Sequence, residues 1–163
     1  MRNLLVLRDI HQKGRVMKAH GMVGHMIRRL NQLSTQVFFR HMQEAGLDLT
    51  SVQFAAMDAI LENPGIDQAG VAGLIGYDRA TIGGVIDRLV QKGLVARQVS
   101  KRDRRAREVA LTPEGEALFQ RMLPIVAGLQ AEIVGRLTPE EQAIFFKLAR
   151  KAIGEDRDEP RPE

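Results

Sequence analysis

Apolar side chains recur at the spacing of an α-helix through most of the chain. Met26, Leu30, Leu33 and Val37 step by four, three and four residues and predict a first helix over residues 24–46. Capping residues and turn sequences divide the part that follows. They predict three shorter helices, over residues 50–62, 68–75 and 79–91, and two longer ones that begin at Thr112-Pro113 and Thr138-Pro139.

The apolar period changes to two after the fourth predicted helix. Residues 94–99 read as one short strand, and Val109 and Leu111 alternate with their neighbours as a second. The stretch between the strands, 100–107, is polar and basic. The predicted fold is therefore mainly α-helical with one small β-hairpin, in the order of four helices, hairpin and two helices.

The apolar stripes of the end helices are long for so small a subunit. The fifth helix carries Leu118, Met122, Ile125, Leu129 and Ile133 on one face. Helices at the two ends of the chain have little of their own subunit to pack against. We therefore predict a homodimer whose interface is formed by the helices of residues 24–46 and 112–153. Residues 50–111 form a separate lobe within the single chain of residues 21–163. Residues 1–20 are an N-terminal arm, either loose or a short extra helix.

Two short helices, a tight turn and a basic hairpin are the layout of a winged helix-turn-helix. With Ile82, Val85, Ile86 and Leu89 facing inward, the outer face of the fourth helix is formed by Ala80, Thr81, Gly83, Gly84, Asp87, Arg88 and Gln91. Each glycine costs about 1 kcal/mol relative to alanine inside a helix. The pair indicates either a close approach to DNA or a locally weak helix that packing tolerates.

The charge distribution also favours a nucleic-acid partner. The net charge of the chain is +4, yet residues 78–107 alone hold nine basic and three acidic side chains. Arginine outnumbers lysine 18 to 6, which suits bidentate contacts with phosphates and bases. A solvated surface would mix the two signs, whereas a basic stripe is typical of a DNA-binding face.

Composition excludes several other classes. The 163 residues, 44% of them apolar, are enough for one domain with a core, and the absence of cysteine rules out disulfides and thiolate chemistry. No apolar run approaches the roughly 20 residues of a membrane span, and the N-terminus lacks a secretory pattern, so we expect a cytoplasmic protein. No catalytic motif or metal-spaced histidine set is present. We therefore expect no enzyme activity, no cofactor and no metal site.

The wing sequence carries the most specific motif. Asp103-x-Arg105-x-x-x-Val109-x-Leu111-Thr112, followed by Pro-Glu-Gly, resembles the MarR family of bacterial transcription regulators, and the likeness extends over residues 24–153. The resemblance implies an obligate dimer on a pseudo-palindromic double-stranded DNA operator, usually acting as a repressor and associated with the nucleoid.

The resemblance also implies roles for individual residues. The fourth helix would read the major groove, and Arg105 would enter the minor groove with Arg102 and Arg104 beside it. Asp103 would either orient these arginines or form the turn. Gln68 and Thr81 would meet phosphates or bases, with Arg79 and Arg88 as further candidates. Gly83 and Gly84 depart from the Ser, Thr or Arg of many family members, which leaves the operator sequence open.

Many members of that family release DNA when a small ligand binds, often an aromatic acid. Candidate groups for an aromatic carboxylate or thioester are His25, Arg28, Arg29 and His41. The competing interpretation is that the arginines are solvated and that His41 is a satisfied interface residue. Three other readings differ at the level of function: an enzyme, a DNA-binding dimer controlled by its concentration alone, and an adaptor that has lost DNA binding. The wing arginines argue against the adaptor.

Overall fold

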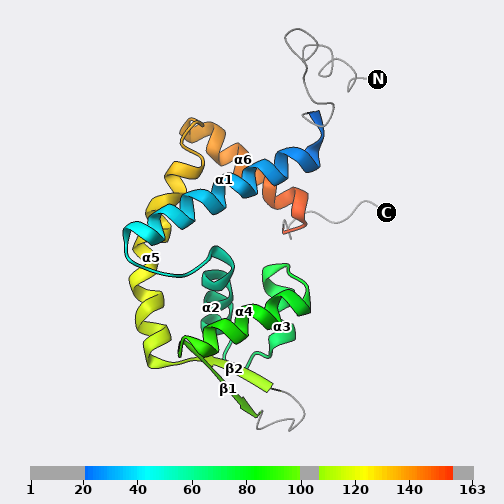
Figure 1. Cartoon of the computed structure of the whole chain (residues 1–163). Coiled ribbons are helices and arrows are strands. Elements are labelled where there is room, and N and C mark those ends of the chain that lie inside the picture. The colour runs from blue at the N-terminus through cyan, green and yellow to red at the C-terminus, as the bar shows by residue number, and fades with distance from the viewer. Residues whose placement is uncertain (1–20, 100–106, 156–163) are drawn as a thin grey trace, which may run out of the picture.

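The computed structural model describes residues 21–99 and 107–155. Within these ranges the chain forms helices and one hairpin in the predicted order (Figure 1): α1 (Val23–Glu44), α2 (Ser51–Glu62), α3 (Gln68–Ile75), α4 (Arg79–Gln91), β1 (Val95–Val99), β2 (Arg107–Leu111), α5 (Pro113–Ile133) and α6 (Pro139–Ile153). Figure 1 shows α5 running along one side of the molecule, with α1 and α6 at one end and α2, α3, α4 and the hairpin at the other.

Local sequence explains where the helices begin. Side-chain oxygens at the N-caps accept hydrogen bonds from the first turn of five helices, at Thr50, Asp67, Asp78, Thr112 and Thr138. Both predicted capping boxes, with Gln53 and Glu141 as the third helical residues, are present. The first helix ends two residues earlier than predicted, because Ala45 is its C-cap and Gly46 already has a left-handed φ of 67°.

The hairpin is joined by backbone contacts to the start of α3. β1 and β2 are antiparallel, with Arg97 opposite Val109. The Val109 amide donates to the Ile66 carbonyl at 2.9 Å. The backbones of Asp67 and Glu108 form an isolated antiparallel β-bridge. The N-terminus of α3 is thereby fixed beside the wing, as a short third strand would be.

The core lies in the lobe, along α5 and beneath the second half of α1. The predicted inward face of α4 is buried as expected, at Ile82, Val85, Ile86 and Leu89. In α5 the stripe differs by one position, because Phe119 is buried and Leu118 is only partly covered. The Phe119 ring stacks on Phe54 of α2 with 4.9 Å between centroids, which draws that face of α5 inward.

Much of the apolar surface of α1 and α6 is uncovered in a single subunit. α6 buries none of its residues, and only the second half of α1 contributes to the core. The exposed apolar side chains are Met22, Val23, Met26, Ile27, Leu30 and Leu33 at the start of α1, and Ile144, Phe146, Leu148 and Ile153 in α6. None of the described helices is both long and apolar enough to span a membrane.

Candidate DNA-binding interface

The cap of α4 fixes the start of the predicted recognition helix. Asp78 accepts from the Thr81 amide at 2.8 Å and from the Thr81 hydroxyl at 2.5 Å. These bonds, the side-chain one foremost, lower the pKa of the Asp78 carboxyl below its usual value. Since a hydroxyl has one proton to donate, Thr81 is left as an acceptor on this face. It can accept from a base amino group but does not donate to a phosphate while the cap is intact.

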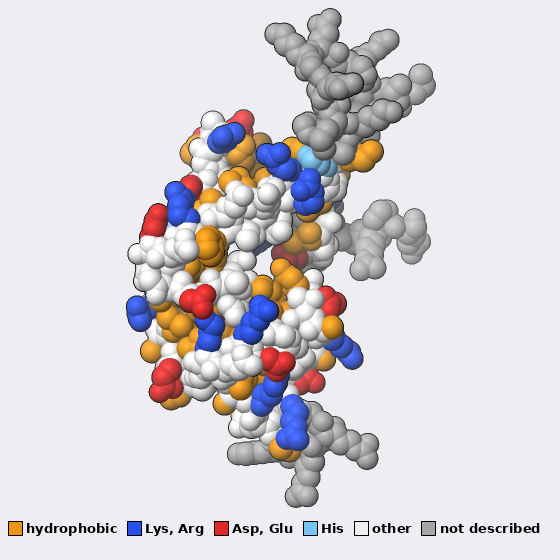
Figure 2. Space-filling model, in the orientation of Figure 1, with side chains coloured by type: hydrophobic (Ala, Val, Ile, Leu, Met, Phe, Trp, Pro, Cys, Tyr) orange, Lys and Arg blue, Asp and Glu red, His pale blue; other side chains and the backbone are white. Residues whose placement is uncertain are grey.

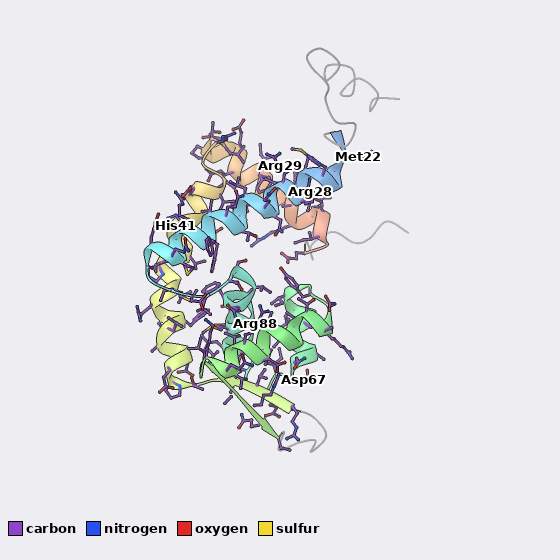
Figure 3. All side chains as sticks on the ribbon, viewed as in Figure 1. Met22, Arg28, Arg29, His41, Asp67 and Arg88 are labelled. Atoms are coloured by element: carbon purple, nitrogen blue, oxygen red, sulfur yellow. The ribbon has the colours of Figure 1, made fainter. Side chains whose placement is uncertain are left out.

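The outer face of α4 is exposed and, apart from Asp87 and Gln91, consists of small and basic residues. Arg79, Ala80, Thr81, Gly84 and Arg88 are all exposed, and Figure 3 shows Arg88 on this helix above the hairpin. A helix with small central residues and arginines near its ends can lie close to base edges while its charges reach the phosphates.

The two glycines of α4 have different surroundings. A Cβ at Gly84 would meet nothing within 4 Å, so this position opens to solvent. A Cβ at Gly83 would lie 3.0 Å from Nε2 of Gln68, because the Gln68 side chain crosses the helix there. Of these two glycines, Gly84 is free of packing within the lobe and Gly83 is half-buried.

Arg97 of β1 is a site residue that the sequence did not single out. Its Nη2 donates to Oδ1 of Asp87 in α4 at 2.5 Å and to Oε1 of Gln68 in α3 at 3.4 Å. One guanidinium thus connects the wing strand with both helices of the helix-turn-helix. No spacing in the sequence brings these three residues together, since Arg97 is 10 residues from Asp87 and 29 from Gln68.

The arginines of the wing tip fall outside the described residues. These are Arg102, Arg104 and Arg105, together with Asp103, all within the range 100–106. The described strands on either side end at Val99 and Arg107, which pair with each other. Figure 2 shows Lys and Arg side chains on the lobe next to this region, with acidic side chains among them.

The four candidate effector residues do not form one cluster in a subunit. Arg28 contacts Nδ1 of His25 at 3.1 Å near the start of α1. His41 lies sixteen positions further along the helix than His25, about 24 Å at 1.5 Å per residue. Figure 3 shows Arg28 and Arg29 toward one end of α1 and His41 at the other, next to α5.

His41 belongs to a contact between helices. Its Nε2 lies 2.9 Å from Oε2 of Glu132 in α5, and its Nδ1 lies 3.9 Å from Glu44. Arg40 also pairs with Glu132. The hydrogen bonds from His41 and Arg40 lower the pKa of the Glu132 carboxyl below its usual value. The described residues contain no group of three or more His, Cys, Asp or Glu side chains arranged to hold a metal ion.

Comparisons with known proteins agree with this architecture. A family model described as the MarR family matches residues 47–106. The transcriptional regulator HosA of Escherichia coli is 36% identical over 129 residues, which cover 79% of this chain and 93% of HosA. The HTH-type transcriptional repressor NicR of Pseudomonas putida is 33% identical over 134 residues, 82% of this chain and 84% of NicR.

A solved structure extends the agreement to three dimensions. BpsR of Bordetella bronchiseptica, whose DNA binding is regulated by 6-hydroxynicotinic acid, superposes with a TM-score of 0.76 at 31% identity. The match covers 89% of this chain and 100% of the BpsR chain. Regulators of this family are DNA-binding proteins and not enzymes. With its winged helix-turn-helix and its relatives of similar length, this chain belongs to the MarR family of transcription regulators.

Proposed function

We propose that this chain is a repressor that binds a pseudo-palindromic operator as a homodimer and is released by a small aromatic acid or its thioester. The observation that carries the DNA-binding part is the outer face of α4. It combines small residues with Arg79 and Arg88 and lies beside a wing strand whose Arg97 donates to Asp87 of α4. A protein that binds the chromosome in this way acts in the cytoplasm, at the nucleoid.

The end helices supply the proposed dimer interface. α6 buries nothing in its own subunit, and Ile144, Phe146 and Leu148 are exposed on it. An apolar helix left uncovered is stabilised when a second copy covers it. We assign dimerisation to residues 24–46 and 112–153 and DNA binding to the lobe of residues 50–111. A two-fold dimer then presents two copies of α4 to successive half-sites of the operator.

The proposed contacts with DNA follow from this docking. α4 lies in the major groove, where Ala80 and Gly84 allow close approach, Gly83 lies beneath the Gln68 side chain and Thr81 accepts from a base. Arg79 and Arg88 neutralise phosphates. Arg105 enters the minor groove, with Arg102 and Arg104 beside it and Asp103 orienting them. Direct base contacts from positions 83 and 84 are absent, so sequence preference depends on the residues around them.

The effector part of the proposal has its support in two relatives. NicR is a transcriptional repressor, and the DNA binding of BpsR is regulated by an aromatic carboxylic acid. Arg28 and Arg29, exposed on α1, have the charge that a carboxylate needs. His25 contacts Arg28 and could orient it. His41 is engaged with Glu132, and we propose that it senses the ligand only through this link between α1 and α5.

Fluorescence anisotropy tests the proposal. The purified protein is titrated onto labelled DNA from its own upstream intergenic region, and aromatic acids and their coenzyme A thioesters are then added. Tight, salt-sensitive binding that one compound reverses, with Arg28→Ala and Arg29→Ala variants that bind DNA but resist release, is the expected result. Tight binding that none of the compounds reverses contradicts the effector part and favours control by protein concentration. Binding no tighter than to random DNA contradicts the assignment of this region as the operator.

A further inference from the structure

We infer that Arg97 and Gly83 together position the Gln68 amide as a hydrogen-bond donor to DNA. In this arrangement the side chain that reads DNA at the centre of the recognition helix comes from α3, and the glycine of α4 makes room for it. This inference rests on the proposed DNA binding and adds a positioning role for two residues. It also gives Gly83 a function different from that of Gly84.

The first step is the space above Gly83. Gln68 is the first residue of α3, and its Nε2 lies 3.0 Å from an ideal Cβ at residue 83, a tight contact. A contact that short is tighter than nine in ten real Cβ contacts, so a side chain at residue 83 requires the Gln68 amide to move by a few tenths of an ångström. At Gly84 a Cβ meets nothing within 4 Å, so the restriction is specific to one of the two glycines.

The second step is the orientation of the amide. Arg97 donates to Oε1 of Gln68 at 3.4 Å, and the amide nitrogen lies against α4. A glutamine amide has one acceptor oxygen and two N–H donors. With the oxygen turned toward Arg97, the N–H groups remain for an acceptor outside the protein. Acceptors on DNA are phosphate oxygens, O6 and N7 of guanine, N7 of adenine and O4 of thymine.

The third step is the support of Arg97 itself. Asp87 of α4 holds its guanidinium at 2.5 Å, and the two side chains are 36% and 55% exposed, with Arg97 the less exposed. The pair places a carboxylate beside an arginine on the DNA-facing lobe, which reduces the repulsion between Asp87 and phosphates. Arg97 therefore has a partner on α4 and a partner on α3, and its position sets that of Gln68.

The backbone fixes the same elements a second time. Val109, opposite Arg97 in the hairpin, donates its amide to Ile66, two residues before Gln68. The wing, the N-terminus of α3 and the middle of α4 are thus connected both by main chain and by side chains. Such a rigid arrangement lowers the entropy lost when Gln68 donates to DNA.

A double-mutant cycle between Gly83 and Gln68 tests the inference. A duplex that the wild-type protein recovers from a randomised pool is the probe, and its scrambled version measures non-specific binding. Gly83→Ala and Gln68→Ala are each expected to weaken binding on the order of tenfold. In the Gln68→Ala background, Gly83→Ala is expected to cause no further loss, because there is no amide left to displace. If the loss of affinity in the double variant equals the product of the losses in the two single variants, the inference is overturned and Gly83 approaches DNA directly.

The same duplex separates a base contact from a phosphate contact of Gln68. If Gln68 donates to a base, Gln68→Ala lowers the ratio of specific to scrambled binding. If it donates to a phosphate, both affinities fall together. Thermal unfolding of Gly83→Ala is compared with that of Gly84→Ala, which gains the same helix propensity without meeting Gln68. Both variants are expected to remain folded, so that a loss of binding reports the interface.

Arg97→Ala tests the positioning role of the arginine. We expect weaker specific binding, an unchanged melting temperature and an unchanged salt slope, and no further loss when it is combined with Gln68→Ala. A slope that falls by about 0.9 would make Arg97 a phosphate contact and overturn this role. A wild-type protein that recovers no duplex would refute the proposed function itself. If the wild-type protein binds its duplex but the losses from Gly83→Ala and Gln68→Ala add in free energy, the proposed function stands and only this inference is refuted.

Discussion

His41 at the end of α1 and Glu132 at the end of α5 are joined through Nε2 and Oε2, 2.9 Å apart. Arg40 pairs with the same carboxylate. The two residues are 91 positions apart in the sequence, and they connect two of the helices that we assign to the dimer. α5 also packs on the DNA-binding lobe through Phe119, so the same helix contacts both this junction and the lobe.

Glu132→Gln is expected to change how stability depends on acid. The folded protein holds the pKa of Glu132 below its usual value of 4.5, so the ionised form contributes stability above that pH. The contribution disappears as the pH falls through the lowered pKa. Thermal unfolding from neutral to acidic pH checks this. The wild type should be the more stable protein at neutral pH, and the difference should vanish in acid. If the stabilities of the two proteins change in parallel with pH, the ionised Glu132 carboxylate does not contribute the stability that we assign to it.

Gly115→Ala is expected to destabilise the subunit. A Cβ at this buried position would lie 2.0 Å from the carbonyl oxygen of Leu94, which itself accepts from the Thr112 amide. Backbone cannot yield as a flexible side chain does, so we expect a loss of about 1–3 kcal/mol or more.

The control for this variant is Gly128→Ala in the same helix. Gly128 is exposed and an added Cβ meets nothing within 4 Å. It should be neutral or stabilise by up to about 1 kcal/mol. Chemical denaturation measures both variants. Equal stabilities would show that the junction between Leu94 and α5 is looser than the structure describes.

Phe146→Glu is expected to produce monomers that still fold. Phe146 is 50% exposed in the single subunit and contributes nothing to its core, so a charge there disturbs only the surface that we assign to the dimer. Light scattering after size-exclusion chromatography gives the mass. Lys147→Glu places the same charge on an adjacent polar position and should remain dimeric. A dimeric Phe146→Glu protein would place the interface elsewhere.

Arg105→Ala is expected to weaken operator binding strongly while leaving the dimer intact. The expectation comes from the wing motif, whose resemblance to the family implies that Arg105 enters the minor groove. Anisotropy against the same duplex measures the loss, and circular dichroism confirms the fold. An affinity equal to that of the wild type would refute the assignment of this residue.

Features set by neighbouring residues were predictable from the sequence. The caps at Thr50, Asp67, Asp78, Thr112 and Thr138 each depend on a contact three residues away, so the helix starts matched. The inward face of α4 follows from helical periodicity alone. The exposed apolar residues of α1 and α6 also agree with the reading of these helices as needing more than one subunit to cover them.

Features that depend on the packing of distant segments were not predictable. The helical spacing of apolar residues placed Leu118 on the inward stripe of α5, whereas Leu118 is only partly buried and the fully buried residue is Phe119, which stacks on Phe54. The sequence left two explanations for the glycines of α4, and the answer at Gly83 depends on a side chain fifteen positions earlier in α3. Arg97 appeared as one more basic residue of the stripe until its partners Asp87 and Gln68 were seen.

The most direct test of the central claim is the salt dependence of specific binding. A duplex recovered from a randomised pool and its scrambled version are titrated with the wild-type protein at increasing salt concentration. We predict that the recovered duplex binds more tightly, with one dimer per site, and that the logarithm of affinity falls by about 0.9 per phosphate contact for each tenfold rise in salt. Equal affinity for the two duplexes with a flat response to salt would contradict the account.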